Sequence, residues 1–328
     1  MIHHISKTWR SERMFITQTQ IVLTGTLLLG IAAGMVGTFA VLRRRALAGD
    51  VVAHAALPGL CLAFLAFQSR SIIVLLSGAL LSGLLGAVTV SMLKRFTRLR
   101  DDAVQGIVLS VFYGGGIALT RSIQNTHRND SGADLESFIV GQAATMLKGD
   151  VQQIAVVVAV TVIIVVMLFK ELKLLSFDEQ FCQVQGWSAT GLDVLLMLLT
   201  AVIVVVGLPA VGVVLTAALL IIPPAAARFW SDRLSRMMMI ACVIGGISGV
   251  TGTLLSARYD GLPTGPLIVL TSTAIFVLSW VLAPHRGLLW KSREVTDLES
   301  FLPWVESDAA EPPAPTTSGS PGSAQEIS

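Results

Sequence analysis

The chain has 328 residues, of which 53% are hydrophobic and only 13% are charged, and its formal net charge is +2. A soluble domain carries about a quarter of its residues as charged ones, so this composition excludes an ordinary soluble protein. A net charge this small gives no indication of nucleic-acid binding. The apolar residues gather in repeated stretches of about 20 residues, and each is long enough to cross the ~30 Å hydrocarbon core as a helix. The sequence therefore predicts an all-α polytopic membrane protein.

Nine apolar segments are predicted to cross the membrane, with eight crossings as the alternative. Connections rich in Lys and Arg follow every second segment, as is typical of the cytoplasmic side. We therefore expect the N-terminus outside and the C-terminus in the cytoplasm, although Lys7, Arg10 and Arg13 place positive charge on the outer side. The predicted spans lie at about 20–42, 50–68, 71–93, 102–121, 151–169, 191–208, 211–229, 237–256 and 265–283.

The spans define a transmembrane domain over residues 20–284, with an N-terminal extension at 1–19 and a cytoplasmic tail at 285–328. After about residue 305 the tail is rich in Pro, Ser, Thr and Gly, so we expect it to be disordered. Within three spans, small residues recur at four-residue spacing, which permits close helix packing in a membrane. They are Gly30/Gly34, Gly78/Ser82/Gly86 and Gly245/Gly249.

Asp50 and His54 are the strongest candidates for a functional site. At a spacing of four residues they share one helix face. An ionisable group inside a membrane span is costly, so it usually faces a pore, a partner or a bound ion. Carboxylate oxygen and imidazole nitrogen together suit a divalent transition metal, and metal affinity should fall as His54 is protonated. One chain supplies too few ligands for a closed site, so two chains about a two-fold axis would complete it.

Pro58 and Gly59 follow one turn after His54 and predict a local bend of the helix. Pro58 cannot donate a backbone hydrogen bond to the carbonyl of His54, which leaves that oxygen free beside the imidazole. A structural interpretation is the alternative. Asp50 would then cap the helix start beside Arg43–Arg45, and His54 would make a hydrogen bond between helices.

A short amphipathic helix is predicted at 177–185, between the fifth and sixth spans. Ser176 and Glu179 have the spacing of a capping box, and Gly186 suits the left-handed position that often follows a helix. The pattern therefore predicts a two-turn helix on the cytoplasmic side.

The predicted helix has Phe177 and Phe181 on its apolar face, with Asp178 and Glu179 on its polar side. One hypothesis is that the two Phe side chains dock into a groove of a cytoplasmic partner. The alternative is that the helix lies on the membrane surface.

The chain contains no G-x-x-x-x-G-K-[ST] phosphate loop and no H-E-x-x-H or G-x-S-x-G motif. These absences favour a transport subunit and not an enzyme. Cys61, Cys182 and Cys242 are isolated in the sequence and predict no disulfide framework.

Several segments together resemble the membrane permease subunit of the manganese/zinc/iron ABC transporters, and their order and spacing match over roughly residues 20–284. The segments are Gly49-Asp50 through His54 to Leu57-Pro58-Gly59, Asp102 through Gly106, Phe177-Asp178-Glu179-Gln180-Phe181 with Gly186, and Val211-Gly212-Val213-Val214-Leu215 through Ile222-Pro223 with Ala225-Ala226-Ala227.

The resemblance implies a fold like that of vitamin-B12-type importer permeases, in a multi-pass protein of the bacterial plasma (inner) membrane. Two permeases, identical or related, would form a central pathway over two cytoplasmic ATP-binding cassette ATPases. An external metal-binding lipoprotein or periplasmic protein would deliver the metal.

The resemblance also implies roles for individual residues. Asp50 and His54 would hold the transported ion, which is manganese, zinc or iron, with manganese favoured, and no cofactor would be bound permanently. The helix from Phe177 to Gly186 would couple the permease to its ATPase.

Two alternatives stay open. An ABC permease for a chelated metal or cofactor would need a wider pathway lined by small residues, and would depend less on Asp50 and His54. A proton-coupled secondary metal transporter would work without an ATPase, and its cytoplasmic helix would have no partner.

Overall fold

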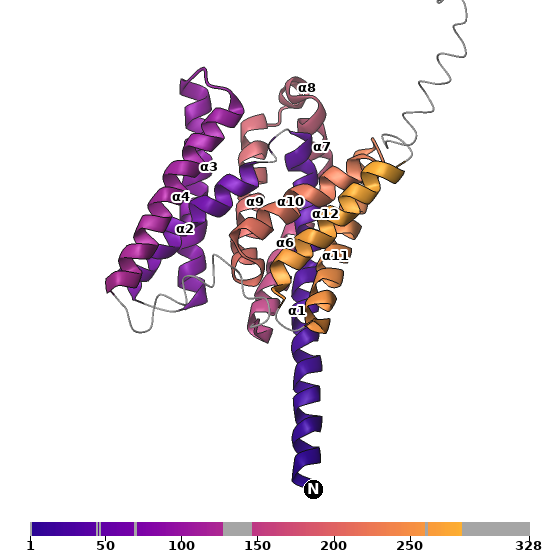
Figure 1. Cartoon of the computed structure of the whole chain (residues 1–328). Helices are drawn as coiled ribbons and strands as arrows, with labels where there is room; N and C mark the ends of the chain where they lie inside the picture. The colour runs from indigo at the N-terminus through magenta and orange to yellow at the C-terminus, as the bar shows by residue number, and fades with distance from the viewer. Residues whose placement is uncertain are drawn as a thin grey trace, which may run out of the picture.

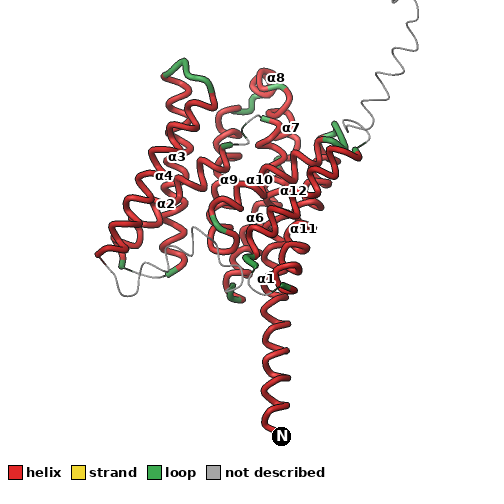
Figure 2. The backbone as a smooth tube through the Cα atoms, in the orientation of Figure 1, coloured by secondary structure: helices red, strands yellow, loops and turns green. Residues whose placement is uncertain are grey.

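The computed structural model describes residues 2–43, 45, 47–68, 71–126, 146–259 and 262–283. Within these ranges all regular secondary structure is helical (Figure 2), which confirms the all-α prediction. The helices are α1 (Ile2–Leu42), α2 (Ala48–Phe67), α3 (Ile72–Phe96), α4 (Asp101–Thr126), α6 (Lys148–Met167), α7 (Phe169–Phe177), α8 (Glu179–Val184), α9 (Ala189–Val211), α10 (Val213–Arg228), α11 (Leu234–Arg258) and α12 (Thr264–Leu282).

Eight of the described helices, all except α7, α8 and α10, are long and apolar enough to cross a membrane. The predicted span at 211–229 forms the shorter helix α10, whose apolar stretch is Leu215–Arg228. Although α10 is short, it packs against α1, α2, α9, α11 and α12. The N-terminus and the end of α12 lie toward opposite ends of the bundle (Figure 1).

The helix α1 is the centre of the larger part of the bundle. It packs most extensively on α11 and also contacts α6, α7, α9 and α10. Its inward side chains Leu29, Val36 and Phe39 are fully buried. The predicted extension at 2–19 continues the first span as one helix, which projects beyond the other helices at its N-terminal end (Figure 1).

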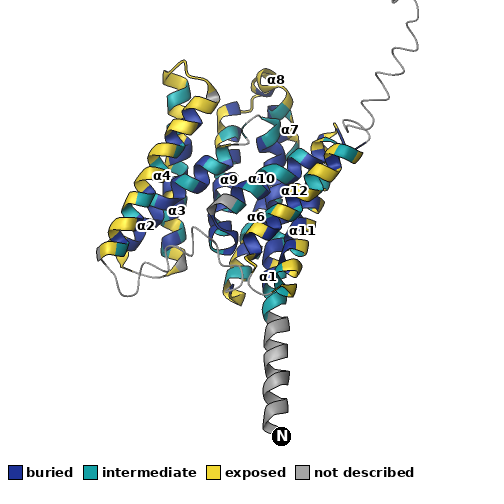
Figure 3. Cartoon of the chain, in the orientation of Figure 1, coloured by how far each residue is buried: buried dark blue, intermediate teal, exposed yellow. Residues whose placement is uncertain are grey.

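The helices α2, α3 and α4 form a second group beside the first (Figure 1). The group joins the rest of the bundle through contacts of α2 and α3 with α9, and of α2 with α10. The outward faces of α3 and α4 are largely exposed, whereas most side chains of α2 are buried (Figure 3). Among the described helices, α2 alone carries Asp and His within one predicted span, and it is the best covered of the three helices in this group.

Glycines bring α1 and α11 into backbone contact. A Cβ atom added to Gly245 would lie 2.2 Å from the carbonyl oxygen of Gly30, and one added to Gly30 would lie 2.2 Å from that of Gly245. Thr26 adds hydrogen bonds across the same interface, at 3.3 Å to the Gly249 carbonyl and 3.0 Å to the hydroxyl of Thr253. The small-residue spacing predicted close packing here, and the structure confirms it.

Near Pro58, the helix α2 packs closely against neighbouring helices on two sides. A Cβ on Gly59 would lie 2.2 Å from the carbonyl oxygen of Gly78 in α3, and a Cβ on Gly116 in α4 would lie 3.1 Å from Cδ of Pro58. Pro58 lies inside α2, and Ser82 of α3 donates a 2.6 Å hydrogen bond to the carbonyl of Ala55. The segment that follows His54 is therefore fixed by both neighbours.

The predicted tail at 285–328 lies outside the described residues.

Candidate functional site

Asp50 and His54 lie on adjacent turns near the start of α2 and face each other. Nε2 of His54 is 3.3 Å from Oδ1 of Asp50, and the side chains are 14% and 30% exposed, respectively. Both belong to a helix whose neighbouring residues Val51, Val52 and Ala53 are buried. The pair is therefore a polar site within an apolar span, and the carboxylate is its more open end.

The separation of the two atoms fits a shared ion. Two ligand atoms that are each about 2.1 Å from a metal lie about 3.0–3.4 Å apart when the angle at the metal is about 90–110°. The observed 3.3 Å falls within this interval. No cluster of three or more His, Cys, Asp or Glu side chains occurs among the described residues, so this part of the chain offers two ligands and not a complete shell.

The structural alternative for the pair has no support among the described contacts. The N-cap residue of α2 is Leu47, and no side chain makes a cap hydrogen bond there. Arg43 and Arg45 pair with Asp193 of α9 and not with Asp50. Nδ1 of His54 is buried without a hydrogen-bond partner in the described part of the chain, so the expected bond between helices does not form.

Tyr113 of α4 completes the surroundings of His54. The two rings meet edge to face, with centroids 4.7 Å apart and planes at 75°. Tyr113 is partly exposed, and Gly114 and Gly115 beside it would meet no atom within 4 Å if they carried a Cβ. Sequence reasoning missed Tyr113, because only the packing of α4 on α2 reveals its contact. Of the three consecutive glycines at 114–116, only Gly116 lies close to α2, so the run was a weak signal of this contact.

The predicted helix at 177–185 begins later than expected. The backbone breaks at Asp178, which separates α7 from α8, and Oδ1 of Asp178 accepts a 2.9 Å hydrogen bond from the backbone N–H of Phe181. The capping box from Ser176 to Glu179 was wrong, because the Ser176 hydroxyl donates to the carbonyl of Leu172 within α7. An aspartate carboxylate is a strong helix cap, so it takes the position two residues further on.

The end of α8 agrees with the prediction. Gly186 has a φ of +86°, in the left-handed region that favours glycine. Its N–H bonds to the Gln183 carbonyl at 3.0 Å, and the N–H of Trp187 bonds to that of Cys182 at 3.2 Å. These bonds end the helix and turn the chain toward α9.

The apolar side chains of α8 and its flanks point away from the bundle. Phe177 is 62% exposed, Phe181 is 48% exposed and Val184 is 82% exposed, whereas Cys182 is fully buried against the bundle. In Figure 1, α7 and α8 lie at one end of the molecule, the same end as the C-terminal end of α1. We call Phe177, Phe181, Val184 and the partly exposed Trp187 the α8 surface.

A charged cluster lies directly behind the α8 surface. The guanidinium of Arg43 donates to the carbonyl of Leu175 at 2.8 Å and pairs with Glu179 at 3.2 Å and with Asp193 at 3.2 Å. Arg45 pairs with the other carboxylate oxygen of Asp193. Sequence reasoning used Arg43–Arg45 as an orientation signal and as possible neighbours of Asp50, and it did not identify Asp193.

The comparisons with known proteins agree with this architecture. The model of the ABC 3 transport family matches residues 16–283. The chain belongs to this family. The match confirms the resemblance inferred from the motifs, and with the eight long apolar helices it makes the protein a multi-pass membrane permease.

Two relatives are equally similar to this family member. The manganese transport system membrane protein MntC of Bacillus subtilis is 46% identical over 274 residues, which cover 84% of this chain and 63% of the relative. The zinc transport system membrane protein TroC of Treponema pallidum is 46% identical over 291 residues, which cover 88% of this chain and 97% of the relative. Sequence identity therefore does not separate manganese from zinc.

A solved structure carries the same fold. PsaBC from Streptococcus pneumoniae in complex with Fab matches with a TM-score of 0.72 and 30% sequence identity, and the match covers 81% of this chain and 92% of that chain. The predicted permease fold is thereby confirmed.

Proposed function

We propose that this chain is the membrane permease of an ATP-driven importer of divalent transition-metal ions, and that Asp50 and His54 hold the ion during passage. The observation that carries the proposal is the 3.3 Å separation of Nε2 and Oδ1 inside an apolar span. Ionisable residues within a membrane span are by default candidates for a substrate or ion pathway. Manganese and zinc are named in the two 46% identical relatives, which supports a metal cargo.

Manganese is the favoured ion. The two candidate ligands are one oxygen and one nitrogen, and no thiolate joins them, since Cys61 of the same helix contacts Thr120 at 3.2 Å and not His54. Carboxylate oxygen and imidazole nitrogen suit manganese, zinc and iron alike, so the preference for manganese rests on the family resemblance. Zinc and iron accept the same ligands, so the uptake experiment below compares manganese with zinc.

A second permease is proposed to complete the ligand shell. Asp50 is the more exposed member of the pair, and the neighbouring Tyr113-Gly114-Gly115 face of α4 is uncovered in this chain. A two-fold axis passing beside this face would bring a second Asp50 and His54 to the same ion. Four ligands would then be available where one chain offers two.

The α8 surface is proposed to dock into a groove of a separate ATPase. Two exposed Phe side chains on a short helix are suited to anchoring in such a groove, and the buried Cys182 fixes the helix to the permease. In this arrangement the end of the bundle that carries α8 is cytoplasmic, together with the end of α12. The N-terminus is then external, where a metal-binding protein would deliver the ion.

Uptake by a strain that lacks the natural protein tests the proposal. Cells expressing this chain with its ATPase and binding protein should accumulate manganese in an ATP-dependent manner, with weaker accumulation of zinc. Asp50→Ala and His54→Ala should each reduce uptake by at least about tenfold, since each removes a ligand. Asp102→Asn is the matched control, because its carboxylate is exposed at the first turn of α4.

Membrane abundance of each variant must equal that of the wild type for the comparison to count. Normal manganese uptake by both alanine variants would overturn the assignment of the site. Uptake that persists when ATP is depleted, and that follows the proton gradient, would instead identify a secondary transporter.

A further inference from the structure

The charged cluster behind the α8 surface connects two parts of the molecule that the proposed function treats separately. Arg43 touches both α7 and α8, through the Leu175 carbonyl and the Glu179 carboxylate. The same guanidinium contacts Oδ1 of Asp193 at 3.2 Å, and Arg45 pairs with Oδ2. A single carboxylate therefore bridges the end of α1 and the connection that leads into α2.

The cluster is buried enough for the loss of one of its ion pairs to affect the structure. The side chains of Arg43 and Asp193 are 11% and 16% exposed. Removal of one partner of a pair this well covered leaves an uncompensated charge, in contrast to an exposed surface pair. The ion pair between Arg43 and Glu179 is the weaker contact, because Glu179 is exposed. The hydrogen bond from the same guanidinium to the Leu175 carbonyl also connects α7 to Arg43.

Arg45 is linked to the metal-site helix by the backbone. Its carbonyl accepts a 3.0 Å hydrogen bond from the N–H of Ala48, the first residue of α2. Asp50 follows in the same first turn, and His54 follows one turn later. A displacement of Arg45 therefore moves the turn that carries the Asp50 carboxylate.

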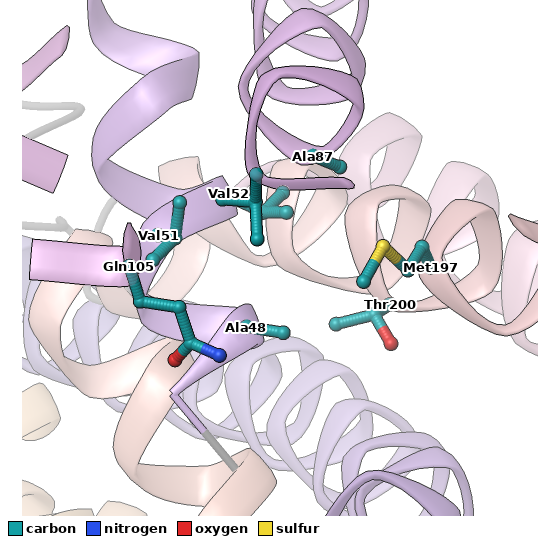
Figure 4. A pocket seen from close by; sticks show the side chains of 8 residues that line it. Ala48, Val51, Val52, Ala87, Gln105, Met197 and Thr200 are labelled. Atoms are coloured by element: carbon teal, nitrogen blue, oxygen red, sulfur yellow. The ribbon is translucent and has the colours of Figure 1, made fainter. Parts of the chain in front are cut away.

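Packing around this first turn is incomplete. A cavity of about 20 Å³ is lined by Ala48 together with Arg43, Arg45 and Asp193. A second cavity of about 10 Å³ lies between α2, α3, α4 and α9, and Figure 4 shows Gln105 of α4 reaching across it toward Ala48. Each volume is about that of one water molecule.

These cavities matter because close packing opposes movement. Ala48, Met197 and Thr200 line both of them. The first turn of α2 borders both cavities, although Gly49, Val51 and Val52 are buried against its neighbours. The ion pair of Arg45 with Asp193 is a further contact that restrains the residues before this turn.

We infer that Asp193 is a positioning residue that transmits movement of the docking helix to the metal site, through Arg43 on one carboxylate oxygen and Arg45 on the other. The inference rests on the proposed function, because it links the docking of the α8 surface on the ATPase to the position of the Asp50–His54 pair. Asp193 is not proposed to bind the ion or the ATPase. Its effect is to set where Asp50 lies when α8 moves.

The test uses the complex of permease and ATPase in proteoliposomes, with manganese uptake and ATP hydrolysis measured on the same vesicles. Arg45→Gln is the informative variant, since it removes the ion pair between residue 45 and Asp193 and leaves the Arg43–Asp193 pair in place. We expect ATP hydrolysis to stay near the wild-type rate while manganese transported per ATP falls about tenfold. Asp193→Asn should act in the same direction, and Asp193→Glu should restore part of the coupling.

A second readout does not depend on transport. Leu47 is exposed at the start of α2, so Leu47→Cys can be labelled with a maleimide in the presence and absence of a non-hydrolysable ATP analogue. Nucleotide should change the labelling rate in the otherwise wild-type complex and leave it unchanged when Arg45→Gln is added. A residue with a merely structural role would alter the rate itself but not its response to nucleotide.

The outcomes distinguish a failure of the proposed transport function from a failure of the role assigned to Asp193. Absence of manganese uptake by the wild-type complex would contradict the proposed function, whatever the labelling shows. Normal uptake per ATP and a normal nucleotide response in Arg45→Gln would overturn the role of Asp193. If Asp193→Asn fails to assemble, Arg45→Gln still decides the question, and Asp102→Asn serves as the control for loss of a carboxylate at an exposed position.

Discussion

The imidazole of His54 and the ring of Tyr113 meet edge to face, with centroids 4.7 Å apart. An edge-to-face pair contributes about 0.5–1.5 kcal/mol beyond the area it buries, and here it also limits rotation of the imidazole. Tyr113→Ala should therefore raise the manganese concentration needed for half-maximal uptake about threefold to tenfold. Tyr113→Phe keeps the ring and should behave like the wild type. Equal effects of the two variants would show that the hydroxyl, and not the ring, is the important group.

The α8 surface provides a separate prediction about assembly. Phe177→Ala combined with Phe181→Ala should weaken association with the ATPase at least about tenfold, because buried aromatic anchors carry much of the energy of an interface. Co-purification of the two subunits at decreasing concentration measures the effect. Phe67→Ala is the control, since Phe67 is as exposed but ends α2 far from α8 in sequence. Unchanged co-purification would favour a helix that lies on the membrane surface.

The backbone contact of α1 with α11 predicts a stability defect. A methyl group at Gly245 would overlap the Gly30 carbonyl, so Gly245→Ala should destabilise the permease by about 1–3 kcal/mol. Thermal unfolding of the purified protein in detergent measures the change. Gly149→Ala is the control, because a Cβ there meets no atom within 4 Å and alanine favours the helix. A melting temperature unchanged by Gly245→Ala would mean that the two helices separate easily.

Gln105 predicts a change of the opposite sign. The residue is 4% exposed, and its Oε1 has no hydrogen-bond partner among the described residues. Gln105→Met keeps the shape of the side chain and removes the unpaired carbonyl, which should stabilise the protein by about 1 kcal/mol in the same unfolding experiment. Gln153→Met, at an exposed position of α6, should change little. A loss of stability would show that ordered water in the cavity of Figure 4 binds the amide.

Much of the membrane architecture was predictable, since hydropathy and helix length act locally. Every predicted span corresponds to a helix. The four-residue spacing within Gly30/Gly34 and within Gly245/Gly249 indicated close packing before any partner was known. The failure at α8 was also local. Two polar residues, Ser176 and Asp178, competed for the cap, and the carboxylate made the bond that the sequence pattern assigned to the hydroxyl.

The surroundings of the candidate site could not be predicted in the same way. The helical spacing of Asp50 and His54 identifies them as a pair in the sequence. Tyr113 is 59 residues from His54 in the chain and contacts it only because α4 packs on α2. Asp193 is hidden for a related reason. It lies at the start of the predicted span 191–208, where an acidic residue is less costly than at the centre of a span and is therefore a weaker signal, and its two arginine partners lie about 150 residues earlier.

The glycine contact between α1 and α11 also constrains how the permease can open. Where two helix backbones touch directly, no side chain lies between them that could change rotamer and allow one helix to slide past the other. These two helices then form a fixed frame, and any alternation between outward and inward access must come from elements that pack less tightly. The first turn of α2 borders two cavities of about the size of one water molecule, and we expect such a rearrangement to include it.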